Sequence, residues 1–393
     1  YLKHFIWLQM RETMNYTVTY LSALSQIEEK VWDSIASDST PFLQYAFLNA
    51  LETSGCVQQT TGWQPHHMIV KLDNIPVAVL PLYIKHHSYG EYVFDQEWAR
   101  AYHQYEMRYY PKLLSSIPFT PVTGPRLICA QPALFDSVLA FTLEQIRLLC
   151  DTVGFSSWHC LFTPQAQSKN WQNLPLLQRT GVQFQWQNRQ YESFDHYLAT
   201  LHSKKRKTIK RERRRMSEQG IQHHWTQAGD MSETDWLNFY QCYCSTYVKK
   251  GQIPYLNLNF FETIAAAKPN NIVCLMAKQA DKLIACSLFF TSDTTLFGRY
   301  WGCIEEKDAL HFETCLYQGI DYTIDHSLQY FDAGAQGEHK LSRGFEPVAT
   351  CSWHWINSPR FREPIRHYVA RESELIKDYH EDCKTLLPFK QTP

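Results

Sequence analysis

The chain has 393 residues, of which 44% are hydrophobic and 15% aromatic, with 18 Pro and 15 Gly. This composition is typical of a folded globular protein and excludes a disordered or fibrous chain. The 38 Lys and Arg residues against 39 Asp and Glu residues give a net charge of -1. A protein that is basic overall is therefore excluded, and any contact with a polyanion must be local.

Cysteine spacing and apolar runs indicate the compartment. The longest apolar stretches fall short of the roughly 20 residues that span a bilayer, so no transmembrane helix is predicted. The 12 Cys residues are scattered without a C-x-x-C pair, a pattern that predicts reduced, buried thiols in a cytoplasmic protein. No Cys lies at ligand spacing from a His pair, so we expect no metal site. Residues 1–13 are expected to be an N-terminal extension.

The first half of the chain begins with an alternating strand from Asn15, followed by an apolar helical face over 27–35. A helix is predicted over 45–54. Two β-rich runs then flank Asp73-Asn74, which is a hairpin signal. A third strand over 89–92, a helix over 111–117 and a strand over 158–162 complete this half.

The second half repeats that order. Helices are predicted over 234–247 and 259–267, two strands flank Ala280-Asp281, and a third strand ends at Gly302. A helix over 310–326 and a strand over 329–333 follow. The matching order predicts two copies of one α/β unit, over 14–190 and 231–393, joined by a basic helical segment and connection over 191–230. The alternative is one large irregular α/β domain.

Long stretches of the sequence resemble a known family. They include TGWQPHH (61–67), GRYWG (298–302), LHFETCLYQGIDY (310–322) and AGAQGEHKLSRGFEPVATCSWHW (333–355). The chain resembles the bacterial FemAB-like, predicted N-acyltransferases that are described as peptidoglycan biosynthesis or recognition proteins and are related to the GNAT acyltransferases. The resemblance implies an α/β (α+β) protein of two tandem GNAT-like units, each a mixed, mostly antiparallel sheet flanked by helices.

The resemblance also implies an activity in the EC 2.3 class. Fem-type enzymes transfer an aminoacyl group from aminoacyl-tRNA to an amine of a peptidoglycan precursor, whereas other GNAT enzymes use acyl-CoA. Either donor would be a co-substrate, and no tightly bound cofactor is expected. Fem-type enzymes also carry a Lys shortly before a Gly-Phe pair, and Lys340 with Gly344-Phe345 is similar. The alternative function is non-catalytic recognition of a peptidoglycan precursor or nucleic acid.

A dense basic run is the strongest local signal. The twelve residues from Lys204 to Arg215 include nine Lys or Arg and one Glu, with Ile209 as the apolar anchor inside the run and Met216 just after it. A helix so cationic suits the phosphates of tRNA, although a solvated helix or a membrane-surface helix would share the pattern. The predicted nucleic-acid or phosphate ligands are Lys204, Lys205, Arg206, Lys207, Lys210, Arg211, Arg213 and Arg214.

Acyl transfer needs a base near the amine and a donor for the developing oxyanion. Five polar residues within eight positions, from Gln336 to Arg343, favour an active-site lining there. We expect Lys340 to stabilise negative charge and Glu338 or His339 to orient or deprotonate the amine. The predicted catalytic residues are Lys340, Glu338, His339, Glu313 and Arg299. The predicted substrate-binding residues are Glu91, Asp95, Tyr110, Lys112, Thr123, Arg126, His311, Gln336 and Arg343. Each could instead serve only the fold.

Overall fold

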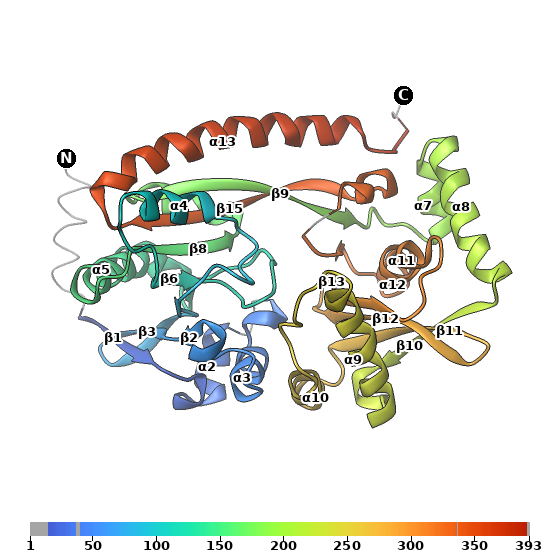
Figure 1. Ribbon diagram of the computed structural model, residues 1–393, viewed down its shortest axis with the longest axis horizontal. Coiled ribbons are helices and arrows are strands. Elements are labelled where there is room, and N and C mark those ends of the chain that lie inside the picture. Colours follow the sequence, from blue (N-terminus) through green and yellow to red (C-terminus); the bar gives the residue numbers. More distant parts are fainter. Residues whose placement is uncertain (1–14, 37–39, 336, 391–393) are drawn as a thin grey trace. The chain divides into compact units, whose positions relative to one another are not determined.

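A computed structural model describes residues 15–36, 40–335 and 337–390 (Figure 1). The predicted extension at 1–13 and the predicted site residue Gln336 lie outside these described residues. The chain divides into two compact units. Unit 1 comprises Tyr1–Gly181 and Thr350–Leu375, and unit 2 comprises Val182–Ala349 and Ile376–Pro393.

Unit 1 combines short strands with helices that cover them. Its elements are β1 (Tyr16–Leu21), α2 (Glu29–Ala36), α3 (Tyr45–Thr53), β2 (Trp63–Pro65), β3 (His67–Leu72), β4 (Ile75–Leu80), β5 (Tyr83–Lys85), α4 (Gln96–Gln104), β6 (Lys112–Ser115), β7 (Ile128–Cys129), α5 (Phe135–Val153), β8 (Ser157–Thr163) and α6 (Ser168–Gln172). Helix α2 packs against β4 and β7, and α5 packs against β8.

Unit 2 has longer strands. Its elements are α7 (Phe194–Thr200), α8 (Ser203–Glu218), β10 (Ile221–Gln227), α9 (Glu233–Val248), α10 (Leu258–Ala267), β11 (Ile272–Gln279), β12 (Lys282–Thr291), β13 (Thr295–Cys303), α11 (Leu310–Phe312), α12 (Gln318–Asp325) and β14 (Tyr330–Asp332). The unit boundaries fall within three further elements, β9 (Leu177–Gln187), β15 (Glu346–Ile356) and α13 (Pro359–Thr385).

Local chemistry explains the hairpins that both units share. Asp73 and Asn74 have φ of 50° and 66°, and Ala280 and Asp281 have φ of 46° and 62°. Two consecutive left-handed residues give the turn whose twist matches that of paired strands. In unit 2, α9 packs so closely on β13 that a Cβ at Gly302 would lie 1.6 Å from the Cys242 carbonyl oxygen. Only glycine permits this contact.

The two units follow a related strand order, although in unit 1 the strands fall into two sheets, with β7 beside β4 and β2 beside β5. In unit 2, β10, β11, β12 and β13 pair successively antiparallel, β13 pairs parallel with β14, and β14 pairs antiparallel with β9. In unit 1, β1, β3 and β4 pair antiparallel, and the chain continues past Leu82 into β5. Strand β5 then pairs antiparallel with β6, β6 parallel with β8, and β8 antiparallel with β15.

Two predicted elements of the first half are wrong. Residues 89–92 form a turn rather than a strand, because Gly90 has φ of 80° and a Cβ there would lie 2.6 Å from the Phe119 ring. The counterpart of β13 is β6, within the stretch predicted as a helix over 111–117. All four residues of β6 are buried, so the strand lacks the alternation that would have identified it.

The other predicted strands and helices named above are confirmed within one to three residues. All 12 Cys residues are free thiols. Among the described residues, no helix is long and apolar enough to cross a membrane.

Candidate functional site

The first part of the candidate site is an ion pair at the ends of β13 and β14. These strands pair in parallel as far as Phe297 and Asp332, and Arg299 follows two residues later. The Arg299 guanidinium donates to both Asp332 carboxylate oxygens, at 3.0 and 2.7 Å. Burial alone would raise the pKa of Asp332, but Arg299 and the Gly334 N–H, 2.9 Å away, hold it below its usual value. Asp332 therefore stays charged.

Lys340 lies beside this pair, on a 3-10 helix over Glu338–Arg343. Its Nζ donates to the carbonyl oxygens of Ala333 at 2.8 Å and Gly334 at 2.6 Å. The side chain is only 3% exposed. Burial, opposed by Asp332 and reinforced by Arg299, lowers the Lys340 pKa to about 8. Described residues occupy two of its three N–H donors, and the third has no partner among them.

Two histidines adjoin Lys340. The rings of His311 and His339 have centroids 5.8 Å apart, and His339 also contacts Phe312 at 5.5 Å. Burial and the neighbouring His339 and Lys340 lower the His311 pKa to about 4. His339 remains accessible to solvent, but its partial burial and the charge of Lys340 also lower its pKa. Both imidazoles are therefore neutral near pH 7, and each can accept a proton or a hydrogen bond.

The two predicted glutamates have different surroundings. Glu338 is exposed and accepts a hydrogen bond from the Tyr379 hydroxyl at 2.9 Å. Glu313 begins a π-helical turn, Glu313–Tyr317, and is 3% exposed. Its Oε1 accepts from Gln318 at 2.8 Å and pairs with Arg213 at 3.1 Å. Burial raises the Glu313 pKa despite Arg213. π-Helical turns are frequent at functional sites.

Arg343 serves as a buried link. It donates to the Tyr317 hydroxyl at 2.7 Å and pairs with Glu212 at 3.0 Å, and its guanidinium lies 3.5 Å from the Phe312 ring centroid. These contacts join α8, the π-helical turn and the 3-10 helix. They use most of the guanidinium and hold these three segments together.

Unit 1 contains a separate buried charge network. Lys112 is fully buried, pairs with Asp95 and lies 2.8 Å from Glu91. The second lysine, Lys85, lies 4.0 Å from Glu91. Burial raises the Glu91 pKa to about 7 and lowers that of Lys85 to about 7. One oxygen each of Glu91 and Asp95 is buried without a hydrogen-bond partner among the described residues.

The network extends through aromatic and hydroxyl groups. The Tyr109 hydroxyl donates to Asp95 at 2.6 Å and lies 3.1 Å from His159 Nε2, while Ser88 contacts both Lys112 and the Tyr110 hydroxyl. The structure thus brings Glu91, Asp95, Tyr110 and Lys112 together. Arg126 lies elsewhere, fully buried, and donates to the carbonyl oxygens of Val122 and Gly124; Thr123 lies on that same loop.

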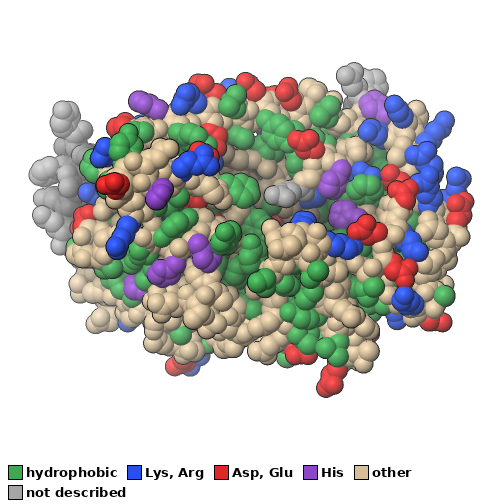
Figure 2. Space-filling view, in the orientation of Figure 1, with side chains coloured by type: hydrophobic (Ala, Val, Ile, Leu, Met, Phe, Trp, Pro, Cys, Tyr) green, Lys and Arg blue, Asp and Glu red, His purple; other side chains and the backbone are tan. Residues whose placement is uncertain are grey.

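The basic run forms α8, with Ile209 and Met216 buried as expected. Lys and Arg side chains gather over this helix (Figure 2). Several are engaged: Lys210 pairs with Asp195, Arg213 with Glu313 and Asp321, Arg214 with Glu218, and Arg215 with Asp308. Among the described residues, the cations without an ion pair on this helix are Lys204, Lys205, Arg206, Lys207 and Arg211.

Sequence reasoning missed several partners of the predicted residues. Asp332 ends a short strand after the aromatic pair Tyr330-Phe331 and stands two residues before Gly334, and this pattern could have identified it. Tyr109 and His159 carry no such local signal, because only the fold places them beside Asp95. No group of three or more His, Cys, Asp or Glu among the described residues could hold a metal ion.

The chain is similar to known proteins in sequence and in fold. Residues 23–391 match the model of the FemAB-like family, described as peptidoglycan biosynthesis/recognition. A search of curated proteins finds no match. The chain is similar to the crystal structure of FemX, with 11% identity over 86% of this chain and 98% of that chain and a TM-score of 0.53.

The chain is also similar to the C-terminal domain of a putative lysylphosphatidylglycerol synthetase from Agrobacterium fabrum. The identity is 8% over 86% of this chain and 94% of that chain, with a TM-score of 0.52. At these identities the similarities establish the fold. The predicted fold class, two tandem GNAT-like units with mixed, mostly antiparallel sheets, is confirmed.

Proposed function

We propose that this chain, which belongs to the FemAB-like family of peptidoglycan biosynthesis/recognition proteins, transfers an acyl or aminoacyl group to an amine. The family membership agrees with the resemblance seen in the sequence. The family description favours a peptidoglycan precursor as the acceptor. The observation that supports transfer most strongly is the set of groups around Lys340, which contains a buried cation, a neutral imidazole and a fixed ion pair within unit 2.

Each group has a task in the proposed reaction. The acceptor amine attacks the carbonyl carbon of the donor, and His339 takes the proton that the amine loses. His339 suits this task better than Glu338, because its lowered pKa leaves it neutral and Glu338 is bonded to Tyr379. The bond between the carbonyl carbon and the leaving oxygen or sulfur of the donor then breaks, and His339 gives its proton to that atom.

Lys340 would stabilise the negative charge that develops on the carbonyl oxygen. Its free N–H is fixed in direction because the Ala333 and Gly334 carbonyls hold the other two, and a preorganised donor needs no rearrangement during the reaction. The Arg299–Asp332 pair holds β14 and β13 beside it. Below a pH of about 8 Lys340 is mostly protonated and can act in this way.

The unpaired cations of α8 support aminoacyl-tRNA as the donor. Lys204, Lys207 and Arg211 have no ion-pair partner among the described residues, and each phosphate they neutralise would add a salt-dependent contribution to binding. Acyl-CoA is the other donor to test.

The test is a product screen by mass spectrometry. The protein is incubated with an amine-bearing peptidoglycan precursor and, in parallel, with charged tRNA or acyl-CoA. We expect the precursor to gain the mass of one aminoacyl or acyl group with one of the donors. Measured binding of the precursor without product from either donor would reject transfer and leave recognition as the function.

A further inference from the structure

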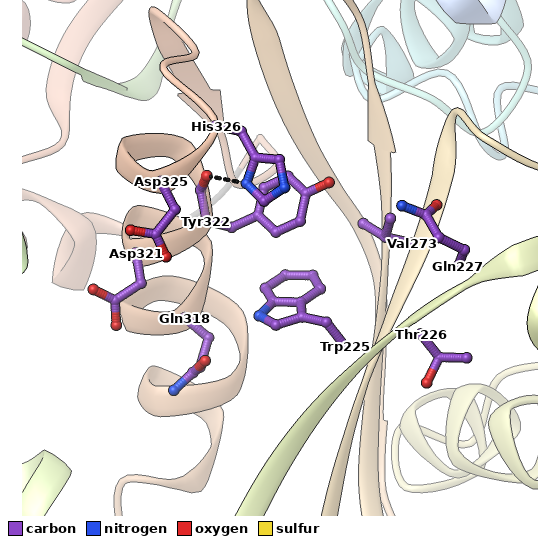
Figure 3. Close-up of a pocket in the computed structure, with 9 residues that line it drawn as sticks. All are labelled: Trp225, Thr226, Gln227, Val273, Gln318, Asp321, Tyr322, Asp325 and His326. Atoms are coloured by element: carbon purple, nitrogen blue, oxygen red, sulfur yellow. Dashed lines mark hydrogen bonds between the residues drawn. The ribbon is translucent and has the colours of Figure 1, made fainter.

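A cavity of about 340 Å³ opens in unit 2 between β10 and α12 (Figure 3). Three aromatic rings line it. The Trp225 ring centroid lies 4.6 Å from that of Tyr322, and His326 stacks on Tyr322 at 3.8 Å and 12°. Trp225 is half-buried, with Phe289 behind it at 5.0 Å. The rings pack on one another and form an apolar wall of the cavity.

The polar lining of the same cavity is acidic. Asp321 and Asp325 lie one turn apart on α12 and both line it. Asp321 pairs with Arg213 at 2.7 Å, but Arg213 also pairs with Glu313. Asp325 is exposed and has no hydrogen-bond or ion-pair partner in the part of the chain that the structure describes. One guanidinium thus pairs with two carboxylates, and Asp325 adds a third negative charge without a cation, which leaves an excess of negative charge.

We propose that this cavity binds an alkylammonium group. The ammonium would pair with Asp325, and its methylene stem would pack along the apolar wall that the stacked rings form. An anion would meet uncompensated carboxylates here, and a neutral ligand would leave the Asp325 charge without a partner. The size suits an extended chain such as a lysine side chain.

This binding stands apart from the proposed transfer. The cavity contains no residue of the 3-10 helix that carries Lys340, although its lining residues Gln318 and Asp321 contact Glu313 and Arg213. Binding is measured without turnover. Failure of the transferase proposal would leave the cavity proposal intact, and the reverse also holds.

The test compares four probes by ligand-observed NMR titration. Nα-acetyl-lysine methylamide represents an amine on a peptide, and cadaverine represents a free diamine. The corresponding Nε-acetylated lysine and N-acetylglucosamine are neutral controls. We expect both amines to bind and both neutral probes to bind at least about fivefold more weakly. Tighter binding of the lysine derivative would identify a peptide as the source, and tighter binding of cadaverine a free amine.

A matched pair of variants locates the binding. Asp325→Asn removes the unpaired carboxylate from an exposed position and should weaken amine binding about fivefold. Asp281→Asn removes the same charge from the exposed β11–β12 turn, where its φ of 62° suits Asn, and should change nothing. Equal binding of neutral and amine probes, or equal effects of the two variants, would overturn the proposal.

Discussion

Lys112→Met probes the buried charge network of unit 1 most directly. Lys112 Nζ is fully buried, with Asp95, Glu91 and Ser88 as its partners. Methionine has a similar volume but neither charge nor donor. The substitution therefore leaves Asp95 and Glu91 without their main cation in a low-dielectric environment.

The expected cost follows from that burial. Breaking a buried ion pair by removing one partner costs about 3–5 kcal/mol, because the remaining charge stays uncompensated. Lys85 compensates little, since it lies 4.0 Å from Glu91 and its own pKa is lowered to about 7. Lys85→Met should therefore cost only about 1 kcal/mol, the usual value of one hydrogen bond, here to the Tyr89 carbonyl.

The cost should also depend on pH. The pKa of Glu91 is raised from 4.5 to about 7 in the folded protein. Between these two pH values Glu91 is protonated in the folded protein and ionised in the unfolded chain. Stability from Glu91 is thus fully present below pH 4.5 and is lost as pH rises through about 7. Without Lys112 the Glu91 pKa rises further, so the deficit of Lys112→Met should be larger at pH 8 than at pH 6.

The assay is urea unfolding at both pH values, monitored by hydrogen exchange of peptides that cover β5 and β6. Lys71→Met, on β3 of the same unit, is the control and should change the unfolding free energy by less than about 0.5 kcal/mol. If Lys112→Met costs no more than Lys85→Met at pH 8, the assignment of Lys112 as the central charge of this network is refuted.

Three further predictions concern unit 2. Lys340→Met should lower turnover about 100-fold, the loss usual for one oxyanion donor, while Lys282→Met on an exposed hairpin should leave steady-state rates unchanged. Replacing three unpaired cations of α8 by Glu, at Lys204, Lys207 and Arg211, should weaken tRNA binding and make its salt dependence shallower. Filter binding at several salt concentrations measures both effects. The same charge change at Lys250, Lys268 and Lys278 should produce neither effect. Because the His311 pKa is lowered from 6.5 to about 4, its contribution to stability is present above pH 6.5 and lost as pH falls toward 4. Melting temperatures of His311→Gln should therefore fall less steeply over that range, and an unchanged slope would contradict a buried neutral imidazole.

Local signals in the sequence were sufficient for much of the fold. The paired turns at Asp73-Asn74 and Ala280-Asp281 marked the repeat, and the nine cations around Ile209 marked α8. Strand β6 and helix α5 were missed for different reasons. Strand β6 is buried on both faces, so apolar and polar residues do not alternate along it. Helix α5 lies in a stretch to which no helix was assigned, although its buried Leu139, Leu143 and Ile146 have helical spacing.

The candidate site was predictable only in part. Polar residues concentrated in one short segment pointed to Lys340 and His339, and their roles stay a prediction. Charges among aromatics pointed to Glu91 and Lys112, but sequence spacing could not show that Lys112 is fully buried. Likewise Arg213 was expected to bind phosphate, but it pairs with Glu313 and Asp321. Both partners lie 100 or more residues from Arg213 in the sequence, so no local pattern could reveal these pairs.

The central claim is group transfer to an amine, and transfer of a labelled aminoacyl group tests it most directly. Charged tRNA and labelled acyl-CoA are offered separately, with the amine-bearing precursor, to the native protein and to Lys340→Met. We predict labelled precursor from one donor with the native protein, a rate that falls as pH rises through about 8, and about 100-fold less product with the variant. Equal product from both proteins would contradict the role of Lys340, and no product from either donor would contradict transfer itself.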